Sequence, residues 1–490
     1  MSLTGKTVTS IFYTGSTKLV QRGLGMISML ILARILTPED FGLVSICTLA
    51  VFLFNSLSDV GAKQYIIRAK QIDDDLINTA WTLNILIKGV IWLIFFIFTP
   101  EIAVFMDKPE IETPLRFLSV ILVVGLISNP GIWLFSRDLN YKPLFKIDIT
   151  SKLISFTTVL VIAYFDRTYW AMLYGLVLQY LLPSIFSNFV CTHRRKFKLS
   201  NIGSQVRFSQ WVVINSLVGF ARGEGDSILV AKYFNLDMIG VYSIFKSLSS
   251  MPLSQLINPA TDPLLATFSE AIRDDDFQPY QMNTVLLLLL SLVVPLTAMM
   301  AYFDKEIVLL MLGEKWVEHS YIFSILAFMM VPGVLFKVLS EYVMAEGGYK
   351  PIVFYQVSMT LITLGILYLI IGGNLEEFSQ TRVLISVVSI LIFATYFQLK
   401  YKLFKFSDMF LFALPLVSAG AATLCLEGLD LTQLHWLSRL ILGCSVFSLV
   451  YVVMLLTLVY LNRKRYECKL FLSYIGAVKS FARRKSSNKQ

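Results

Sequence analysis

The segment 208–234, FSQWVVINSLVGFARGEGDSILVAKYF, is an apolar run with three charged residues near its middle, Arg222, Glu224 and Asp226. A run of this length is long enough to cross the roughly 30 Å hydrocarbon core of a bilayer. A charge at that depth costs about 2.5–3.5 kcal/mol on insertion scales, and it persists where it faces protein or water. The segment therefore predicts a transmembrane helix whose charged residues serve a task inside the protein.

The whole chain shares this apolar character. Of its 490 residues, 56% are hydrophobic and only 15% are charged, and the mean hydropathy is +0.68. Soluble domains carry about 25% charged residues, so the composition predicts an all-α polytopic membrane protein. Lys18 and Arg22 interrupt the first apolar run and no small-residue cleavage site follows it, so we expect a retained helix rather than a signal peptide.

Apolar runs predict fourteen transmembrane helices. Basic residues concentrate in the loops after even-numbered runs, for example at Arg194–Lys198, so both termini are expected in the cytoplasm. The net charge of +9 follows this topology and does not indicate nucleic-acid binding. The predicted runs are 8–33, 41–62, 78–98, 115–135, 147–165, 168–190, 208–234, 238–262, 283–303, 320–344, 352–371, 382–399, 408–427 and 436–461.

The sequence contains an internal repeat. A shift of 198 residues aligns Gly42 with Gly240 and Ser45 with Ser243. A shift of 205 residues aligns further identical residues later in the two units. Each unit has six runs, an even number, so both units begin on the same side of the membrane. The repeat therefore predicts two parallel six-helix lobes, 1–200 and 201–405, that face each other across a central cavity. Two additional helices would occupy 406–462 and a basic cytoplasmic tail 463–490, where residues 466–482 form either an amphipathic surface helix or a frayed topology anchor.

Motifs for catalysis and for metal or cofactor binding are not found. The five cysteines show no paired spacing, and the three histidines have no metal-ligand spacing. The acidic runs 73–75 and 274–276 are better explained as solvated helix entries than as metal ligands of an enzyme that acts on sugar nucleotides. The predicted loops are too short to house a catalytic domain. We therefore expect a protein that is not an enzyme and that needs no metal or cofactor.

Charged residues inside the predicted helices are the candidate site. Lys18 and Arg22 are spaced i,i+4 on one helix face and require a nearby anion, from the protein or from a ligand. Arg222 and Asp226 have the same spacing and can pair with each other. A net-positive cavity suits a phosphate or diphosphate headgroup, whose oxygens match the guanidinium fork. Further charged residues at or near membrane depth are Glu224, Asp59, Lys152, Lys246, Lys337 and Glu341.

Several other features have two interpretations. Gly219 and Gly223 form a G-x-x-x-G pair, which is typical of close helix packing. Aromatic residues near helix ends either offer ring faces to sugars or belong to the interfacial belt; they include Tyr13, Tyr65, Trp133, Tyr242 and Tyr342.

Four short stretches resemble a known family, the polysaccharide flippases of the multidrug/oligosaccharidyl-lipid/polysaccharide exporter superfamily. They are ARILTPEDFG at 33–42, DVGA at 59–62, GVYS at 240–243 and LGEKW at 312–316. The resemblance covers about residues 1–400 and is closest to the colanic-acid-exporter-like group.

The resemblance implies an inner-membrane protein of bacteria that works by alternating access. It implies that a polyprenyl-diphosphate-linked oligosaccharide is flipped from the cytoplasmic to the outer leaflet for the assembly of lipopolysaccharide or exopolysaccharide. Lys18 and Arg22 match the cavity-lining basic residues of the family's first helix. Arg222 and Asp226 match the charged stretch of its seventh helix, although Glu224 and two glycines depart from the usual pattern.

The expected headgroup ligands are therefore Lys18, Arg22 and Arg222, with Glu224, Asp226 and Asp59 as charge partners or coupling residues. Membrane lipids and polysaccharide polymerase and export machinery are the expected partners. Two alternatives remain: a cation-coupled multidrug exporter of the same superfamily, whose cavity acids should dominate, and a glycan polymerase or ligase, which needs a large external loop. A scaffold protein would not need duplicated lobes.

Overall fold

The computed structural model describes residues 3–200, 202–403, 408–429, 431 and 433–474. These residues are arranged in helices and connecting turns, and they contain no β-strand. The chain divides into two compact units, Met1–Ser243 and Ile244–Gln490, whose boundary falls inside helix α12 (Leu236–Pro252). This boundary lies beyond the one predicted at residue 200, and the division into two six-helix lobes stays a prediction.

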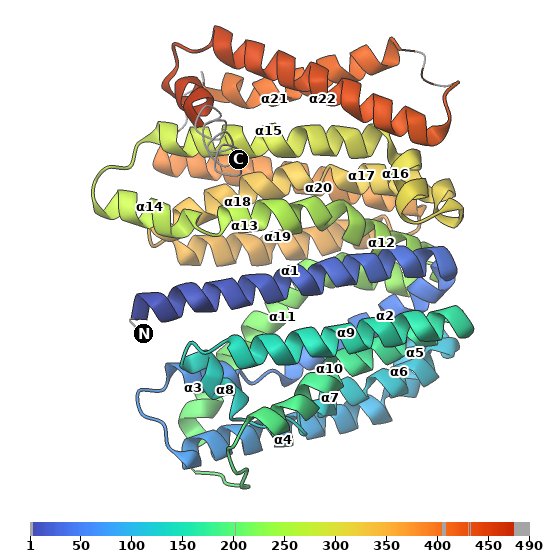
Figure 1. The fold of residues 1–490 in the computed structure, drawn as a ribbon, viewed down its shortest axis with the longest axis vertical. Coiled ribbons are helices and arrows are strands. Elements are labelled where there is room, and N and C mark those ends of the chain that lie inside the picture. The colour runs from blue at the N-terminus through green and yellow to red at the C-terminus, as the bar shows by residue number, and fades with distance from the viewer. Residues whose placement is uncertain (1–2, 201, 404–407, 430, 432, 475–490) are drawn as a thin grey trace, which may run out of the picture. The chain divides into compact units, whose positions relative to one another are not determined.

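In the first unit, α9 packs against both α1 and α10, and α2 packs against α11 (Figure 1). Thr37 and Asp40 form a capping box at the start of α2, which explains why a helix begins within the stretch 33–42. The helices are α1 (Leu3–Ile35), α2 (Pro38–Ser58), α3 (Ala62–Arg68), α4 (Asp74–Ile97), α5 (Thr99–Phe105), α6 (Glu112–Leu118), α7 (Val120–Val124), α8 (Ile132–Arg137), α9 (Lys142–Phe165), α10 (Trp170–Val190) and α11 (Ile202–Tyr233).

The start of α2 meets the start of α12 at two glycines. A Cβ atom on Gly42 would lie 1.9 Å from the carbonyl oxygen of Leu236, and one on Gly240 would lie 1.9 Å from that of Pro38. The hydroxyl of Ser45 donates to that of Ser243 over 2.8 Å. Gly42 and Gly240, and likewise Ser45 and Ser243, are related by the sequence shift of 198.

The G-x-x-x-G pair of α11 does not pack as expected. A Cβ atom on Gly219 or Gly223 would meet nothing within 4 Å. Helical glycines of this unit at which an added Cβ atom would clash with a neighbouring helix are instead Gly42 on α2, Gly240 on α12 and Gly175 on α10.

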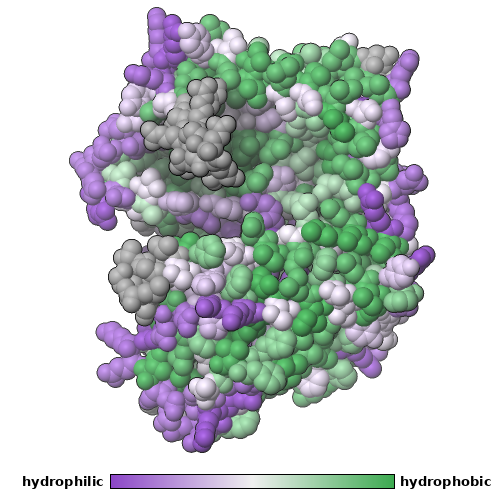
Figure 2. All heavy atoms as spheres, in the orientation of Figure 1, coloured by the Kyte–Doolittle hydropathy of each residue, from purple (hydrophilic) through white to green (hydrophobic). Residues whose placement is uncertain are grey.

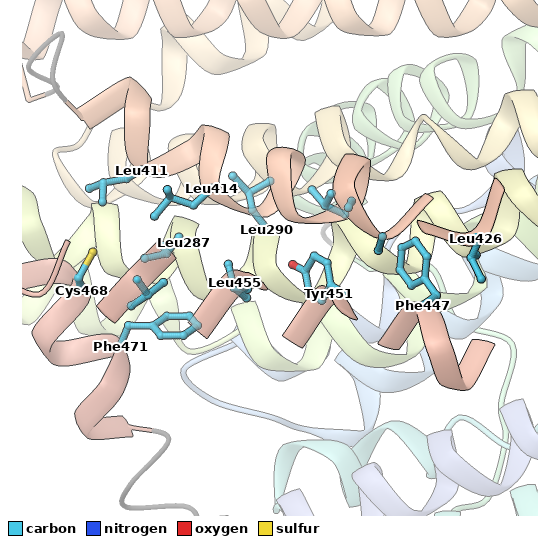
Figure 3. Packing of buried hydrophobic residues seen from close by; sticks show 14 of the residues in the cluster. Leu287, Leu290, Leu411, Leu414, Leu426, Phe447, Tyr451, Leu455, Cys468 and Phe471 are labelled. Atoms are coloured by element: carbon cyan, nitrogen blue, oxygen red, sulfur yellow. The ribbon is translucent and has the colours of Figure 1, made fainter. Parts of the chain in front are cut away.

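In the second unit, α21 and α22 pack against each other and against α15 (Figure 1). Leu287, Leu414 and Phe447 contribute to the buried core between them (Figure 3), and the Tyr451 hydroxyl donates to the carbonyl of Ser291 over 2.9 Å. After the π-helical turn Leu253–Ile257, the helices are α13 (Asn258–Thr261), α14 (Leu264–Arg273), α15 (Pro279–Tyr302), α16 (Asp304–Met311), α17 (Ser320–Ala327), α18 (Met330–Ala345), α19 (Tyr349–Leu369), α20 (Leu375–Tyr401), α21 (Met409–Glu427) and α22 (Trp436–Leu461).

Among the described residues, ten helices are long and apolar enough to cross a membrane. On the face shown in Figure 2, hydrophobic residues predominate between the helix ends and hydrophilic residues gather toward them. The chain is a multi-pass membrane protein. Helices α1 and α11, with 33 and 32 residues, are long enough but carry internal charges and are not among the ten. The run 115–135 is divided among α6, α7 and α8, so the count of fourteen stays a prediction.

Candidate functional site

Lys18 and Arg22, near the middle of α1, lie about one helical turn apart and are exposed. The Ser10 hydroxyl donates to the carbonyl of Leu139 over 2.7 Å, and the rings of Tyr13 and Phe145 are 5.5 Å apart, which fixes the face that α1 turns to α9. Lys18 and Arg22 follow a different stripe of the helix, where both side chains remain accessible. An accessible pair of cations in an apolar helix is suited to binding an anion.

The three charged residues of α11 differ in burial. Arg222 is exposed, Glu224 is half-buried, and only 3% of Asp226 is exposed. The Tyr242 hydroxyl donates to Oδ2 of Asp226 over 2.8 Å, and the amide of Ser227 donates to Oδ1 over 2.9 Å. The sequence left open whether Arg222 pairs with Asp226, and it did not predict the contact with Tyr242, because this contact joins α11 to the next helix.

A small polar cavity of about 150 Å³ lies between α2, α11 and α12. The Ser227 hydroxyl donates to Oε2 of Glu224 over 3.0 Å at its wall. Its lining residues are Ser45, Thr48, Leu49, Phe52, Glu224, Ser227, Val230, Ile239, Tyr242 and Ser243. The cavity thus collects one carboxylate and several hydroxyl groups beside the buried Asp226. In the described part of the chain, no group of three or more His, Cys, Asp or Glu side chains is placed to hold a metal ion.

The remaining candidate residues have contacts within their own units. In the first unit, the amide of Gly61 donates to Oδ1 of Asp59 over 3.1 Å, and Lys152 donates to Gln179 over 2.9 Å across α9 and α10. These contacts are local, and a role of Asp59 or Lys152 in a cavity stays a prediction.

In the second unit, the Nζ of Lys337 and Oε1 of Glu341 form an ion pair of 2.7 Å within α18. Lys246 is half-buried in α12. The structure gives no relation between these three residues and the charged residues of the first unit, so their place in a shared cavity stays a prediction.

Two lysines tie the end of α5 to the end of α11, and the sequence did not predict their role. Lys108 is buried and donates to the carbonyls of Met106 and Ala231 over 3.2 and 3.0 Å. Lys232 donates to the carbonyl of Phe105 and, over 2.5 Å, to Oδ2 of Asp107. Lys108, which follows α5, therefore binds a carbonyl at the end of α11, and Lys232, on α11, binds a carbonyl at the end of α5. The two contacts hold the ends of these helices together.

The sequence matches the model of a family described as polysaccharide biosynthesis protein over residues 31–321, more than half of its length. The chain belongs to this family. It is 24% identical to the lipopolysaccharide biosynthesis protein WzxC of Escherichia coli over 345 residues, 68% of either chain. It is 20% identical to the succinoglycan biosynthesis transport protein ExoT of Rhizobium meliloti, over 93% of this chain and 94% of that protein.

Among solved structures, the lipid II flippase MurJ in an inward closed conformation aligns with a TM-score of 0.73. The alignment covers 93% of this chain and all of that one, at 15% identity, and so establishes a shared fold. Family and fold confirm the resemblance seen in the sequence.

The Tyr242–Asp226 hydrogen bond gives a prediction for stability. Tyr242→Phe removes a hydroxyl that donates to a buried carboxylate, and bonds to charged groups contribute about 1.5–3 kcal/mol. We expect the free energy of unfolding to fall by about that amount, as measured by thermal unfolding of the detergent-solubilised protein. Tyr164→Phe, at a residue that is 68% exposed, is the control and should change nothing. Equal behaviour of the two variants would contradict the assigned contact.

The Asp107–Lys232 pair gives a prediction for pH. The hydrogen bond from Lys232 and its positive charge hold the pKa of the Asp107 carboxyl below its ordinary value. A carboxyl whose pKa is lower in the folded state stabilises the fold above the ordinary Asp pKa, about 3.9, and this stabilisation is lost as the pH falls through the folded-state pKa.

We therefore expect the melting temperature of the wild-type protein to fall more steeply than that of Asp107→Asn as the pH is lowered below about 4. The exposed Asp138, changed to Asn, is the control and should follow the wild type. Parallel curves for wild type and Asp107→Asn would show that the pair does not contribute.

Proposed function

We propose that this protein flips a polyprenyl-diphosphate-linked oligosaccharide from the cytoplasmic to the outer leaflet of the bacterial inner membrane, for the assembly of a cell-surface polysaccharide. Three observations support this: membership of the polysaccharide biosynthesis family, the transport function named for a relative of nearly full length, and the fold shared with a lipid II flippase. The protein alternates between states open to either side and catalyses no covalent step.

The headgroup is held by Lys18, Arg22 and Arg222. The observation that carries this assignment is the accessible pair of cations one turn apart on α1, a helix whose 33 residues are enough to cross a membrane. A diphosphate offers two neighbouring negative charges, which match two cations separated by about one 5.4 Å turn. Arg222, exposed on α11, supplies a guanidinium whose fork binds phosphate oxygens in bidentate fashion.

The acids serve a different purpose. Glu224 lines the small cavity between α2, α11 and α12. Asp226 accepts a hydrogen bond from Tyr242, which also lines this cavity. A carboxylate among hydroxyl groups takes up a proton or a cation, and such binding changes the local charge. We assign Glu224 and Asp226, with Asp59 as a more distant candidate, to coupling rather than to the headgroup.

Both termini face the cytoplasm in this proposal, and the substrate is received from and delivered to other membrane proteins of polysaccharide polymerisation and export. The lipid tail remains among the membrane lipids while the headgroup crosses.

A reconstituted system separates this proposal from that of a multidrug exporter. Vesicles containing the purified protein are loaded with either a fluorescent polyprenyl-diphosphate oligosaccharide or a lipophilic cationic dye, and an ion gradient is applied. We expect protein-dependent leaflet exchange of the lipid-linked oligosaccharide and no protein-dependent movement of the dye. Dye export without exchange of the oligosaccharide would favour the multidrug exporter and contradict the proposal.

A further inference from the structure

A second cavity of about 430 Å³ lies in the first unit, apart from the charged residues assigned above. It falls within the size range of ligand pockets, about 300–1,000 Å³. The end of α3, the following turn, the start of α4 and the first turns of α11 form it. Its lining residues are Tyr65, Arg68, Ala69, Gln71, Leu76, Ser204 and Phe208.

The wall formed by α3 is fixed by one arginine. Nη1 of Arg137, on α8, donates to the carbonyls of Ile66, Ile67 and Ala69 over 2.7, 3.0 and 2.6 Å. These carbonyls belong to the end of α3, where no intrahelical donor is available. Arg137 therefore holds the helix end that presents Tyr65 and Arg68 to the cavity.

The wall formed by α11 is fixed by close backbone approach. The Ser209 hydroxyl donates to the carbonyl of Val60 over 2.7 Å. A Cβ atom on Gly61 would lie 2.8 Å from Val212 and 3.2 Å from the Phe208 ring, and Gly61 has a φ of +64° that favours glycine. The turn before α3 thus packs directly against α11, and Phe208 has a defined position at the cavity.

The chemistry of the cavity combines aromatic rings with uncharged hydrogen-bonding groups and one cation. The rings of Tyr65 and Phe208 lie 5.8 Å apart, and the hydroxyls of Tyr65 and Ser204 are hydrogen-bonded over 2.8 Å. The guanidinium of Arg68 lies 6.0 Å from the centre of the Phe208 ring. Gln71 adds an amide, and the lining residues include no carboxylate.

Such a surface matches a sugar ring better than a bare phosphate. A pyranose presents an apolar C–H face, which packs on aromatic rings, and hydroxyl groups at its edge, which bond to amide, hydroxyl and guanidinium groups. A diphosphate would gain nothing from the two rings. One guanidinium without an opposing acid also tolerates a sugar that carries a carboxylate or phosphate substituent.

We propose that this cavity binds a sugar residue of the lipid-linked glycan on the cytoplasmic side before translocation. The inference rests on the proposed function and adds a glycan-recognition site to it. Residues 63–73, which include most of α3, belong to the connection between two predicted transmembrane runs that the distribution of basic residues places in the cytoplasm. Tyr65 and Phe208 would then select the glycan, while the basic residues of α1 and α11 bind the diphosphate that every such lipid shares.

Equilibrium binding to the detergent-solubilised full-length protein tests the inference without requiring transport. One probe is the polyprenyl-diphosphate oligosaccharide extracted from the cells that make this protein, and the other is the same polyprenyl diphosphate after removal of its glycan. Tyr65→Leu and Phe208→Leu keep much of the apolar volume but remove the rings. We expect each to weaken binding of the glycan-bearing lipid about tenfold, which corresponds to about 1.4 kcal/mol, and to leave binding of the glycan-free lipid within about twofold.

Phe189→Leu is the matched control, because this ring is 82% exposed and does not line the cavity. It should bind both probes as the wild type does, and thermal unfolding should show all variants to be folded. If the ring variants weaken binding of both probes equally, the inference is overturned. The rings would then contribute to binding of the diphosphate or to the stability of the fold, and not to recognition of the glycan. Unchanged binding of both probes would overturn it as well. A wild-type protein that binds neither lipid would instead overturn the proposed function.

Discussion

Gly240→Ala is expected to lower the stability of the protein sharply, by about 3 kcal/mol or more, the upper end for overpacking. The new methyl group would lie 1.9 Å from the carbonyl oxygen of Pro38. Backbone cannot move aside as the end of a flexible side chain can, so α2 and α12 must separate at this point. The measurement is the melting temperature of the purified protein in detergent, together with its elution as a single species.

Gly42→Ala provides a second test of the same contact. Its methyl group would meet the carbonyl of Leu236 at the same 1.9 Å, so we expect a similar loss of stability. Gly219→Ala is the control, since nothing lies within 4 Å of its added Cβ atom. Alanine is about 1 kcal/mol better than glycine in a helix interior, so this variant should be unchanged or slightly more stable. Three equal melting temperatures would contradict the described crossing of α2 and α12.

The double variant Lys18→Ala, Arg22→Ala is expected to slow transport of the lipid-linked oligosaccharide at least tenfold. A hydrogen bond to a charged group contributes about 1.5–3 kcal/mol, and each 1.4 kcal/mol is about a factor of ten. Melting temperatures of the wild type and the double variant are measured alongside, so that a loss of stability is distinguished from a loss of transport. The readout is the initial rate of leaflet exchange in reconstituted vesicles, at several substrate concentrations.

Two controls separate headgroup binding from a general effect of charge. Arg22→Lys keeps the charge but loses the bidentate fork, and it should retain an intermediate rate. Lys305→Ala removes an exposed cation at the start of α16 and should transport as the wild type does. Normal transport by the double variant would show that Lys18 and Arg22 do not bind the headgroup, whatever the function of the protein.

The sequence predicted the helical membrane class because composition and run length decide it. Internal breaks were harder to predict. The run 115–135 is largely apolar, yet the chain forms three short helices there, with one break at Ser119 and a longer one from Gly125 to Gly131. Hydropathy measures the affinity of a segment for an apolar medium and carries little information about where the backbone turns within it.

The residues of the candidate site were chosen from the sequence, and their role in binding stays a prediction. The charged residues of α1 and α11 were found because charges in apolar helices are costly and therefore conspicuous. The partner of Asp226 was missed because the Tyr242 hydroxyl lies on another helix, and no spacing rule joins the two. Lys108 was missed for the opposite reason: its position in a loop resembles that of any solvated lysine, and only the structure shows it buried beside Ala231.

The exchange of a fluorescent polyprenyl-diphosphate oligosaccharide between the leaflets of vesicles tests the central claim most directly. Purified protein is reconstituted, and the fraction of probe protected from an external quencher is followed with time. Protein-containing vesicles should exchange the probe at least tenfold faster than protein-free vesicles, while a fluorescent phospholipid exchanges equally slowly in both. Identical rates for the oligosaccharide probe in the presence and absence of the protein would contradict the account.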